Sequence, residues 1–363
     1  MHALRFPSAR PHPMATTPDY DEFRALLTRS AFAEAAALAE KQCLKPGRSR
    51  AFWLTQLAHA LTRQGKHTRA VEAADEALRE DPVNQYALVA RADAFLGADE
   101  PTKACADYEE VANSTIAGIR NRARIGVLEC LGRDKRWDTV LSRVGGWDLE
   151  PRTSMRWRTR ALAGLGRTDE AVDTCKEWLR QMPDDPHGLW ELVHLEVARE
   201  GVESVRARIG RLAKIPSKPP IYGEIYASLS RQAGHSDEAI VQYEKLSVGA
   251  AAPRMVRQQA FALAKAGREA EAIPLMEELL RLSPSDMYIH TSFVAACKRS
   301  GSLERAWRFY HELMALFPDE RGLYGRLKNV KKALAAVEAP QAPRVEERRG
   351  PAEQGPAGRM RVK

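Results

Sequence analysis

The sequence predicts an all-α protein in which one helical hairpin is repeated along most of the chain. Similar segments recur about every 34 residues, and each segment carries apolar residues at helical spacing. The composition is also rich in alanine, while aromatic residues make up only 7% of the chain. Closely packed helices suit this composition better than a β-sandwich, whose strands favour valine, isoleucine, tyrosine and phenylalanine.

The overall composition excludes several classes of protein. The 363 residues are 44% hydrophobic, which is enough for an ordered core, and no apolar run approaches the ~20 residues that a membrane span needs. The five cysteines are widely spaced without a C-x-x-C motif, which argues against a zinc ribbon and a disulfide framework. The first residues lack the apolar segment of a secretory signal. We therefore expect a cytoplasmic protein with reduced thiols.

The repeat is clearest in five segments that begin with glycine and place an alanine five residues later. These pairs are Gly65 and Ala70, Gly166 and Ala171, Gly234 and Ala239, Gly267 and Ala272, and Gly301 and Ala306. Weaker copies place Ala35, Ala104, Val140 and Val205 at the alanine position. The series contains nine copies, separated by 31 to 36 residues.

Each recurring residue type has a physical role in a helix pair. The small alanine side chain lets two helices approach closely, and glycine suits the left-handed turn that ends the first helix. Prolines lack the amide hydrogen that a continuing helix needs, so they end the second helix. The closing prolines are Pro82, Pro183, Pro284 and Pro318. Each copy therefore predicts a first helix, a turn and a second helix.

This pattern resembles the tetratricopeptide repeat, a helix–turn–helix unit of 34 residues, between residues 16 and 319. The first helix of one copy matches the family with Trp53, Leu57, Ala58 and Leu61. Later copies place Tyr243, Met276 and Tyr310 four residues after the alanine, where the family carries an aromatic residue. The resemblance implies an α-solenoid in which the repeats form a right-handed superhelix.

The same register predicts how the chain is organised. The expected segments are a disordered leader at 1–15, a solenoid at 16–319, a C-terminal capping helix at 320–338 and a disordered basic tail at 339–363. We expect irregular repeats at 121–151, where Val140 precedes two glycines, and at 186–219, which ends in IPSKPP. A capping helix with a polar outer face would keep the end of the solenoid in solution.

No catalytic motif stands out in the sequence. H-E-x-x-H, the phosphate-binding G-x-x-x-x-G-K-[ST], G-x-S-x-G and G-x-G-x-x-G are all absent. His187 and His194 are seven residues apart and could share a helix face, but no third metal ligand accompanies them. The repeats leave no stretch for a separate catalytic domain. We predict a protein that is not an enzyme, with no cofactor, no metal and no small-molecule substrate.

The resemblance implies a partner-binding groove lined by the first helix of each repeat. The residues expected to face it are Arg122, Arg156, Arg160, Trp190, His194, Arg254, Arg257, Phe261 and Tyr288. The chain lacks the carboxylate clamp of chaperone-binding members, since Thr55, His59 and Ala90 stand where the clamp has lysine or asparagine. A protein or peptide of another kind is therefore the expected partner.

The positive charge is concentrated in one part of the chain. The formal net charge is +8, and the block 120–167 holds eleven arginines and one lysine against five acidic residues. Counted from the copy near residue 51, this block covers the third and fourth repeats, and it suits an acidic partner because arginine pairs carboxylates through two bonds. Solvated surface arginines are the simpler interpretation. The alternative function is nucleic-acid binding by the block and the basic tail, although no base-reading code recurs.

Overall fold

The computed structural model describes residues 17–45, 49–249, 252–318, 320 and 322–338. These residues form nineteen helices and no strand, so the prediction of an all-α fold is confirmed. The predicted leader at 1–15 and the predicted tail at 339–363 lie outside the described residues. The chain divides into two compact units, residues 1–205 and residues 206–363.

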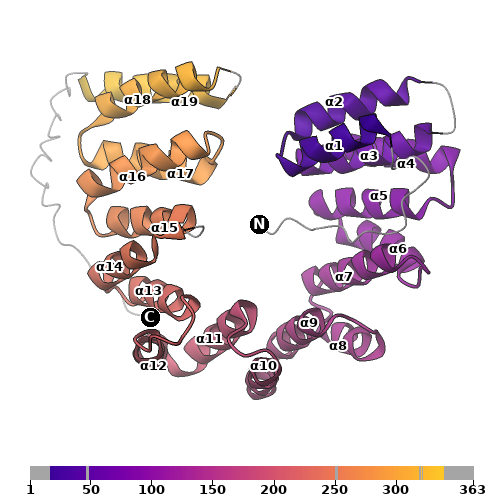
Figure 1. The fold of residues 1–363 in the computed structure, drawn as a ribbon, viewed down its shortest axis with the longest axis horizontal. Coiled ribbons are helices and arrows are strands. Elements are labelled where there is room, and N and C mark those ends of the chain that lie inside the picture. Colours follow the sequence, from indigo (N-terminus) through magenta and orange to yellow (C-terminus); the bar gives the residue numbers. More distant parts are fainter. Residues whose placement is uncertain (1–16, 46–48, 250–251, 319, 321, 339–363) are drawn as a thin grey trace, which may run out of the picture. The chain divides into compact units, whose positions relative to one another are not determined.

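The first unit is a stack of helices in chain order (Figure 1). Its helices are α1 (Pro18–Thr28), α2 (Phe32–Cys43), α3 (Arg50–Arg63), α4 (His67–Glu80), α5 (Gln85–Gly97), α6 (Pro101–Val111), α7 (Ala117–Arg133), α8 (Trp137–Gly146), α9 (Pro151–Gly164), α10 (Thr168–Gln181) and α11 (Pro186–Glu200). Each helix contacts the next, and α3 also contacts α5, α5 contacts α7, and α9 contacts α11. In these three cases the first helices of successive pairs therefore pack on one another.

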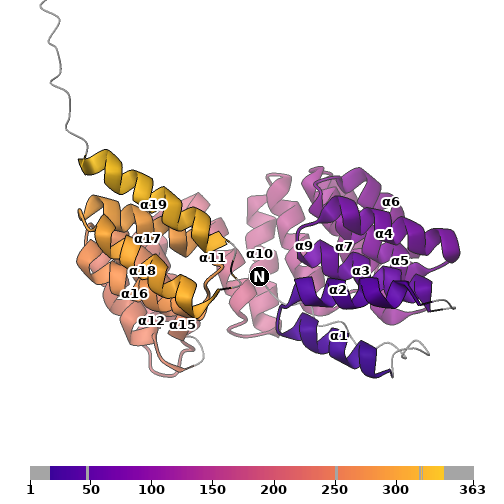
Figure 2. The same ribbon diagram turned by 90° about the horizontal axis from the view of Figure 1, so that it is seen from above.

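The second unit repeats the same arrangement, and Figure 2 shows its helices from a second direction. Its helices are α13 (Ile221–Gln232), α14 (Ser236–Leu246), α15 (Ala252–Lys265), α16 (Glu269–Leu282), α17 (Met287–Arg299), α18 (Leu303–Leu316) and α19 (Gly322–Glu338). Helix α12 (Val202–Ala213) contains the boundary between the two units. Helix α19 packs on α18 and follows the last pair, where a capping helix is expected.

The turn inside each helix pair contains a residue with positive φ. Glycine occupies six of the nine turns, and the five predicted glycines have φ between 68° and 92°. The other three turns use Ser30, Asp99 and Lys135, with φ between 56° and 63°. In most of these turns a backbone N–H donates a hydrogen bond to the carbonyl oxygen five residues earlier. In one of them the Lys66 nitrogen lies 3.0 Å from the Leu61 oxygen. This hydrogen bond is typical of the Schellman motif. The same turn therefore forms at the three positions that lack glycine.

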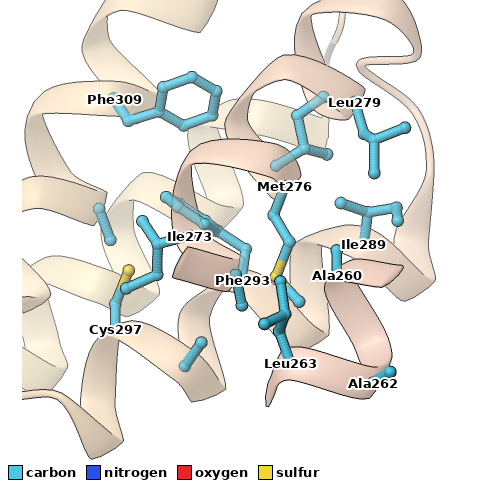
Figure 3. Packing of buried hydrophobic residues seen from close by; sticks show 14 of the residues in the cluster. Ala260, Ala262, Leu263, Ile273, Met276, Leu279, Ile289, Phe293, Cys297 and Phe309 are labelled. Carbon is cyan, nitrogen blue, oxygen red and sulfur yellow. The ribbon is translucent and has the colours of Figure 1, made fainter. Parts of the chain in front are cut away.

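The close contact between helices is confirmed at the alanine position. All nine residues of the series, from Ala35 to Ala306, have no exposed surface, and these include Val140 and Val205. The core around them is apolar. Figure 3 shows part of the core of the second unit, where Leu263, Met276 and Phe293 point toward one another from α15, α16 and α17. A larger side chain at these positions would separate the helices.

A buried histidine in the second unit predicts a pH dependence of stability. His290 Nε2 lies 2.8 Å from the Pro284 carbonyl oxygen and Nδ1 lies 3.0 Å from the Tyr310 hydroxyl. The carbonyl can only accept, so the neutral ring donates from Nε2 and accepts from the tyrosine. Burial lowers the pKa of His290, and the positive charge of Arg326 lowers it further.

Because the folded pKa lies below that of the unfolded chain, the unfolded state takes up a proton first as the pH falls. We expect the free energy of unfolding to fall between about pH 7.5 and 5.5, and to fall less in His290→Phe. Urea denaturation followed by circular dichroism at both pH values measures this difference. Equal pH dependence of the variant and the parent protein would show that His290 does not contribute.

Candidate partner-binding surface

Helices α9 and α11 are joined at their N-terminal ends by a buried carboxylate. Asp185 caps α11, since its Oδ1 accepts hydrogen bonds from the amides of His187 at 2.9 Å and Gly188 at 3.2 Å. Its Oδ2 accepts a hydrogen bond from Arg152 Nε of α9 at 2.7 Å. The Asp185 side chain is only 2% exposed. Asp185 thus both caps α11 and forms an ion pair with Arg152 of α9, and these bonds fix where α11 starts relative to α9.

The indole of Trp178 supports α11 from α10. This side chain is completely buried, and a Cβ atom added at Gly188 would lie 3.1 Å from the ring. Glycine at 188 therefore lets the indole approach the backbone of α11 closely. Packing of a large aromatic side chain makes a major contribution to the stability of such a contact.

Four of the predicted groove residues lie on the two helices that are held together in this way. Arg156 and Arg160 lie one turn apart on α9, and Trp190 and His194 lie one turn apart on the contacting helix α11. Both arginines and His194 are exposed, while Trp190 is half-buried. The Trp190 and His194 rings contact each other with centroids 5.5 Å apart. We call Arg156, Arg160, Trp190 and His194 the α9–α11 patch.

Neither arginine of the patch has a carboxylate partner among the described residues. Arg156 makes no hydrogen bond there, and Arg160 lies over the Trp157 ring at 5.2 Å from its centroid. Arg158 lies between them in sequence but on another side of α9, where it lines a shallow hollow with Glu170 of α10. The patch therefore combines two arginines without a carboxylate partner among the described residues, on α9, with an aromatic pair on the contacting helix α11.

The rest of the basic block is largely used within the first unit. Seven other arginines of the block donate hydrogen bonds to carboxylates or to backbone carbonyl oxygens. These are Arg120, Arg122, Arg124, Arg133, Arg143, Arg152 and Arg167. Most of the +7 charge of residues 120–167 is thus compensated locally, a distinction that charge counting did not reveal.

The predicted groove residue Arg122 belongs to a half-buried network. It pairs with Asp93 of α5, donates to the Tyr108 hydroxyl at 2.8 Å and lies 3.4 Å from Glu129 Oε2. Its side chain is 15% exposed. Burial raises the pKa of Tyr108, and the charge of Asp93 raises it further, so the phenol stays protonated. Arg122 therefore links α5, α6 and α7 and has little surface left for a partner.

In the second unit, two of the four predicted groove residues make ion pairs between helices. Arg254 Nη2 lies 2.6 Å from Glu224 Oε1, and Arg257 Nη1 lies 3.1 Å from Asp286 Oδ2. Arg257 also covers the half-buried ring of Phe261, with 5.6 Å to the centroid. Tyr288 is 75% exposed, and Arg254 also remains exposed despite its ion pair. This surface offers a partner no uncompensated arginine of the predicted set.

Sequence analysis missed the ion pairs that connect successive repeats. An arginine and an acidic residue about one repeat apart recur along each unit. Examples are Arg69 with Glu40, Arg122 with Asp93, Arg143 with Glu109, Arg152 with Asp185, Arg268 with Asp237, Arg281 with Glu312 and Arg299 with Glu269. A search for opposite charges at the repeat spacing could have found them.

Within the part of the chain that the structure describes, no group of three or more histidine, cysteine, aspartate or glutamate side chains is placed to hold a metal ion. None of the helices described there is both long enough and apolar enough to cross a membrane.

Comparison with known proteins identifies the repeat. Residues 55–116, which include parts of α3 to α6, match the family model of the tetratricopeptide repeat. No curated protein matches the chain. Among solved structures, the chain is similar to a tetratricopeptide repeat protein from Parabacteroides merdae, with 13% identity, a TM-score of 0.48, and coverage of 68% of this chain and 97% of that one.

The chain is also similar to the TPR domain of P58(IPK), with 13% identity, a TM-score of 0.27, and coverage of 88% of this chain and 98% of that one. The assignment itself comes from the matched residues and from the buried alanine and left-handed turn that recur in the helix pairs. Residues 55–116 thus belong to the tetratricopeptide repeat family, and the helix pairs on either side share its turn and its buried small residue.

Proposed function

We propose that this chain is a non-enzymatic scaffold that binds an acidic protein segment on the α9–α11 patch. The observation that carries the proposal is the pair Arg156 and Arg160, which are exposed and have no carboxylate partner among the described residues. They lie on α9, which contacts the helix of Trp190 and His194. Tetratricopeptide repeats are protein-interaction modules in general, and the repeat provides the rigid helices on which such a surface can be placed.

The chemistry of the patch favours carboxylates next to an apolar or aromatic side chain. Each guanidinium can donate two parallel hydrogen bonds to one carboxylate, and charge-assisted bonds of this kind are stronger than neutral ones. A half-buried indole offers a flat apolar surface to a side chain of the bound segment. Two arginines one helical turn apart suit acidic residues with a similar spacing in the partner.

Nucleic-acid binding by the whole basic block has less support. Phosphate binding uses many uncompensated cations along a surface, whereas at least seven arginines of the block already bond to groups of the first unit. We therefore favour an acidic peptide over a nucleic acid, and the experiment below separates them.

Selection from a displayed library of random peptides tests this proposal. We expect the full chain to enrich peptides that contain clustered aspartate or glutamate with an aromatic or apolar residue. The variant with Arg156→Gln and Arg160→Gln should fail to enrich them. A control variant with Arg158→Gln and Arg180→Gln removes the same charge from the same unit, but away from the patch.

The control should enrich the same peptides as the parent protein. Enrichment of acidic peptides by the patch variant would contradict the proposal. Binding to single-stranded RNA at low salt that is equal in both variants, together with no peptide enrichment, would favour the nucleic-acid function instead.

A further inference from the structure

The second unit exposes apolar side chains at one of its ends. Successive helices run antiparallel, so the turn between α16 and α17 and the turn between α18 and α19 share this end (Figure 1). Arg281 of α16 and Glu312 of α18 form an ion pair at 2.9 Å, which places the C-terminal ends of these two helices side by side. Five apolar residues at or next to the two turns are more than half exposed, and we call them the apolar end of the second unit. They are Leu282, Met287, Tyr288, Leu316 and Tyr324.

Two leucines of the apolar end occupy the same position in successive repeats. Leu282 and Leu316 are 34 residues apart, and each lies ten residues after the buried alanine of its repeat. In the first unit this position holds polar residues, namely Lys45, Glu80, Ser114, Glu150 and Gln181. Neighbouring large apolar side chains that stay exposed are typical of a surface that an apolar partner covers.

Helix α19 adds positive charge beside the apolar end. Its basic residues are Arg326, Lys328, Lys331 and Lys332, and none of them has a carboxylate partner among the described residues. Lys328 and Lys331 follow Tyr324 by four and seven residues, so these three side chains share one face of the helix. All three are exposed, and Lys331 lies about 10 Å from Tyr324 along the helix axis. We call Lys328 and Lys331 the lysine face of α19.

The first unit does not combine the two features in this way. Leu44 is exposed at the turn between α2 and α3. The cations beside it are paired, since Lys45 lies 3.4 Å from an oxygen of Asp19 and Arg50 pairs with Glu80. The end of the second unit instead brings exposed apolar side chains together with cations that have no carboxylate partner there.

We propose that the apolar end and the lysine face of α19 bind the surface of a bilayer that contains anionic lipids. The apolar side chains enter the headgroup region, where tyrosine is favoured because its ring is apolar and its hydroxyl is polar. The lysines lie over the anionic headgroups. The surface potential of such a bilayer extends over about a Debye length, roughly 10 Å, so it also reaches Lys331. Helix α19 stays in its repeat, because Leu323 and Val330 remain buried in the core of the second unit.

A bilayer accounts for both features of this surface, whereas two other partners account for one each. A nucleic acid would use the lysines, because phosphate binding depends on cations, but it gives no role to the exposed Leu282, Met287 and Leu316. A second copy of this chain would cover the apolar side chains. A symmetric contact of that kind would also bring the unpaired cations of two α19 helices close together, and like charges oppose association. Anionic lipids complement both the charge and the apolar surface.

Cosedimentation of the full chain with lipid vesicles tests this proposal. We expect binding to phosphatidylcholine vesicles that contain about 30% phosphatidylglycerol, little binding to phosphatidylcholine alone, and weaker binding as the salt concentration rises. Lys328→Gln with Lys331→Gln should weaken binding at least about tenfold, because two charges near the anionic surface are lost. Lys265→Gln with Lys298→Gln is the matched control, since it removes the same charge from the other end of the second unit and should bind as the parent protein does.

A second pair of variants tests the apolar end. Leu316→Ser with Tyr324→Ser should also weaken vesicle binding about tenfold, because the side chains that enter the headgroup region are lost. Val241→Ser with Trp307→Ser changes exposed apolar residues of α14 and α18 that lie farther from this end, and it should bind as the parent protein does.

Three results would overturn the proposal. The first is vesicle binding that either variant of the end, the lysine pair or the Leu316 and Tyr324 pair, leaves unchanged. The second is an absence of vesicle binding together with low-salt binding to single-stranded RNA that the lysine pair alone weakens, which would indicate a nucleic acid. The third is a dimer in solution that Leu316→Ser with Tyr324→Ser dissociates, because a second copy would then cover this surface.

Discussion

Replacing Trp178 with alanine should lower the free energy of unfolding of the first unit by about 3–5 kcal/mol. The side chain is the largest of the fully buried ones, and it packs against the backbone of α11 at Gly188. Its removal leaves a cavity between α10 and α11, so the expected loss combines the apolar transfer term with the cavity term. Because α11 carries Trp190 and His194, the variant should also bind the proposed acidic segment less well.

Trp178→Phe is the matched control for this prediction. The indole Nε1 of Trp178 has no hydrogen-bond partner among the described residues, so phenylalanine removes volume without removing a bond. We expect a loss of about 1–2 kcal/mol, well below that of alanine. Urea denaturation followed by tryptophan fluorescence suits the measurement, because six of the seven tryptophans lie in the first unit. Equal losses in the two variants would contradict the packing described for Trp178.

Arg91→Ala should lower the stability of the same unit by about 3 kcal/mol. Arg91 of α5 donates to both carboxylate oxygens of Asp107 of α6, at 2.8 and 2.7 Å, and to Asp75 of α4 at 2.7 Å. The Asp107 side chain is 9% exposed. The alanine variant would leave that carboxylate buried and unpaired, which is far less favourable than loss of an exposed ion pair.

Two comparisons test the origin of this loss. In Arg91→Ala with Asp107→Ala, the loss should be smaller than the sum of the two single losses, because the second change removes the unpaired charge. Arg156 has no carboxylate partner among the described residues. Arg156→Ala should therefore change the free energy of unfolding by less than about 0.5 kcal/mol. Equal losses for Arg91→Ala and Arg156→Ala would show that burial and pairing do not distinguish these arginines.

The sequence alone was sufficient for the repeat, because the repeat is built from local rules. Alanine is required at the close contact because it is small, and glycine in the turn because it tolerates positive φ. In the structure the alanines are buried and the glycines have positive φ. Ser30, Asp99 and Lys135 adopt the same turn without glycine. Their conformation is imposed by the packing of the two helices and by the capping hydrogen bonds, which residue type does not reveal.

The candidate site was less predictable, because charge alone does not show which arginines are paired. Helix register placed Arg122, Arg156 and Arg254 on equivalent faces, yet only Arg156 lacks a carboxylate partner among the described residues. The partners Asp93 and Glu224 lie 29 and 30 residues before their arginines and come from neighbouring repeats. Such pairs depend on how repeats stack, so they become visible only when helices of different repeats are placed together.

The central claim is that Arg156 and Arg160 bind carboxylates of a protein segment, while the paired arginines hold the repeats together. Calorimetric titration of the full chain with an acidic peptide from the displayed library tests it most directly. We expect the variant with Arg156→Gln and Arg160→Gln to bind at least about tenfold more weakly, since each charge-assisted bond contributes about 1.5–3 kcal/mol. The variant with Arg158→Gln and Arg180→Gln should match the parent protein at about 0.15 M salt. Equal weakening in both variants, or none in the first, would contradict the claim.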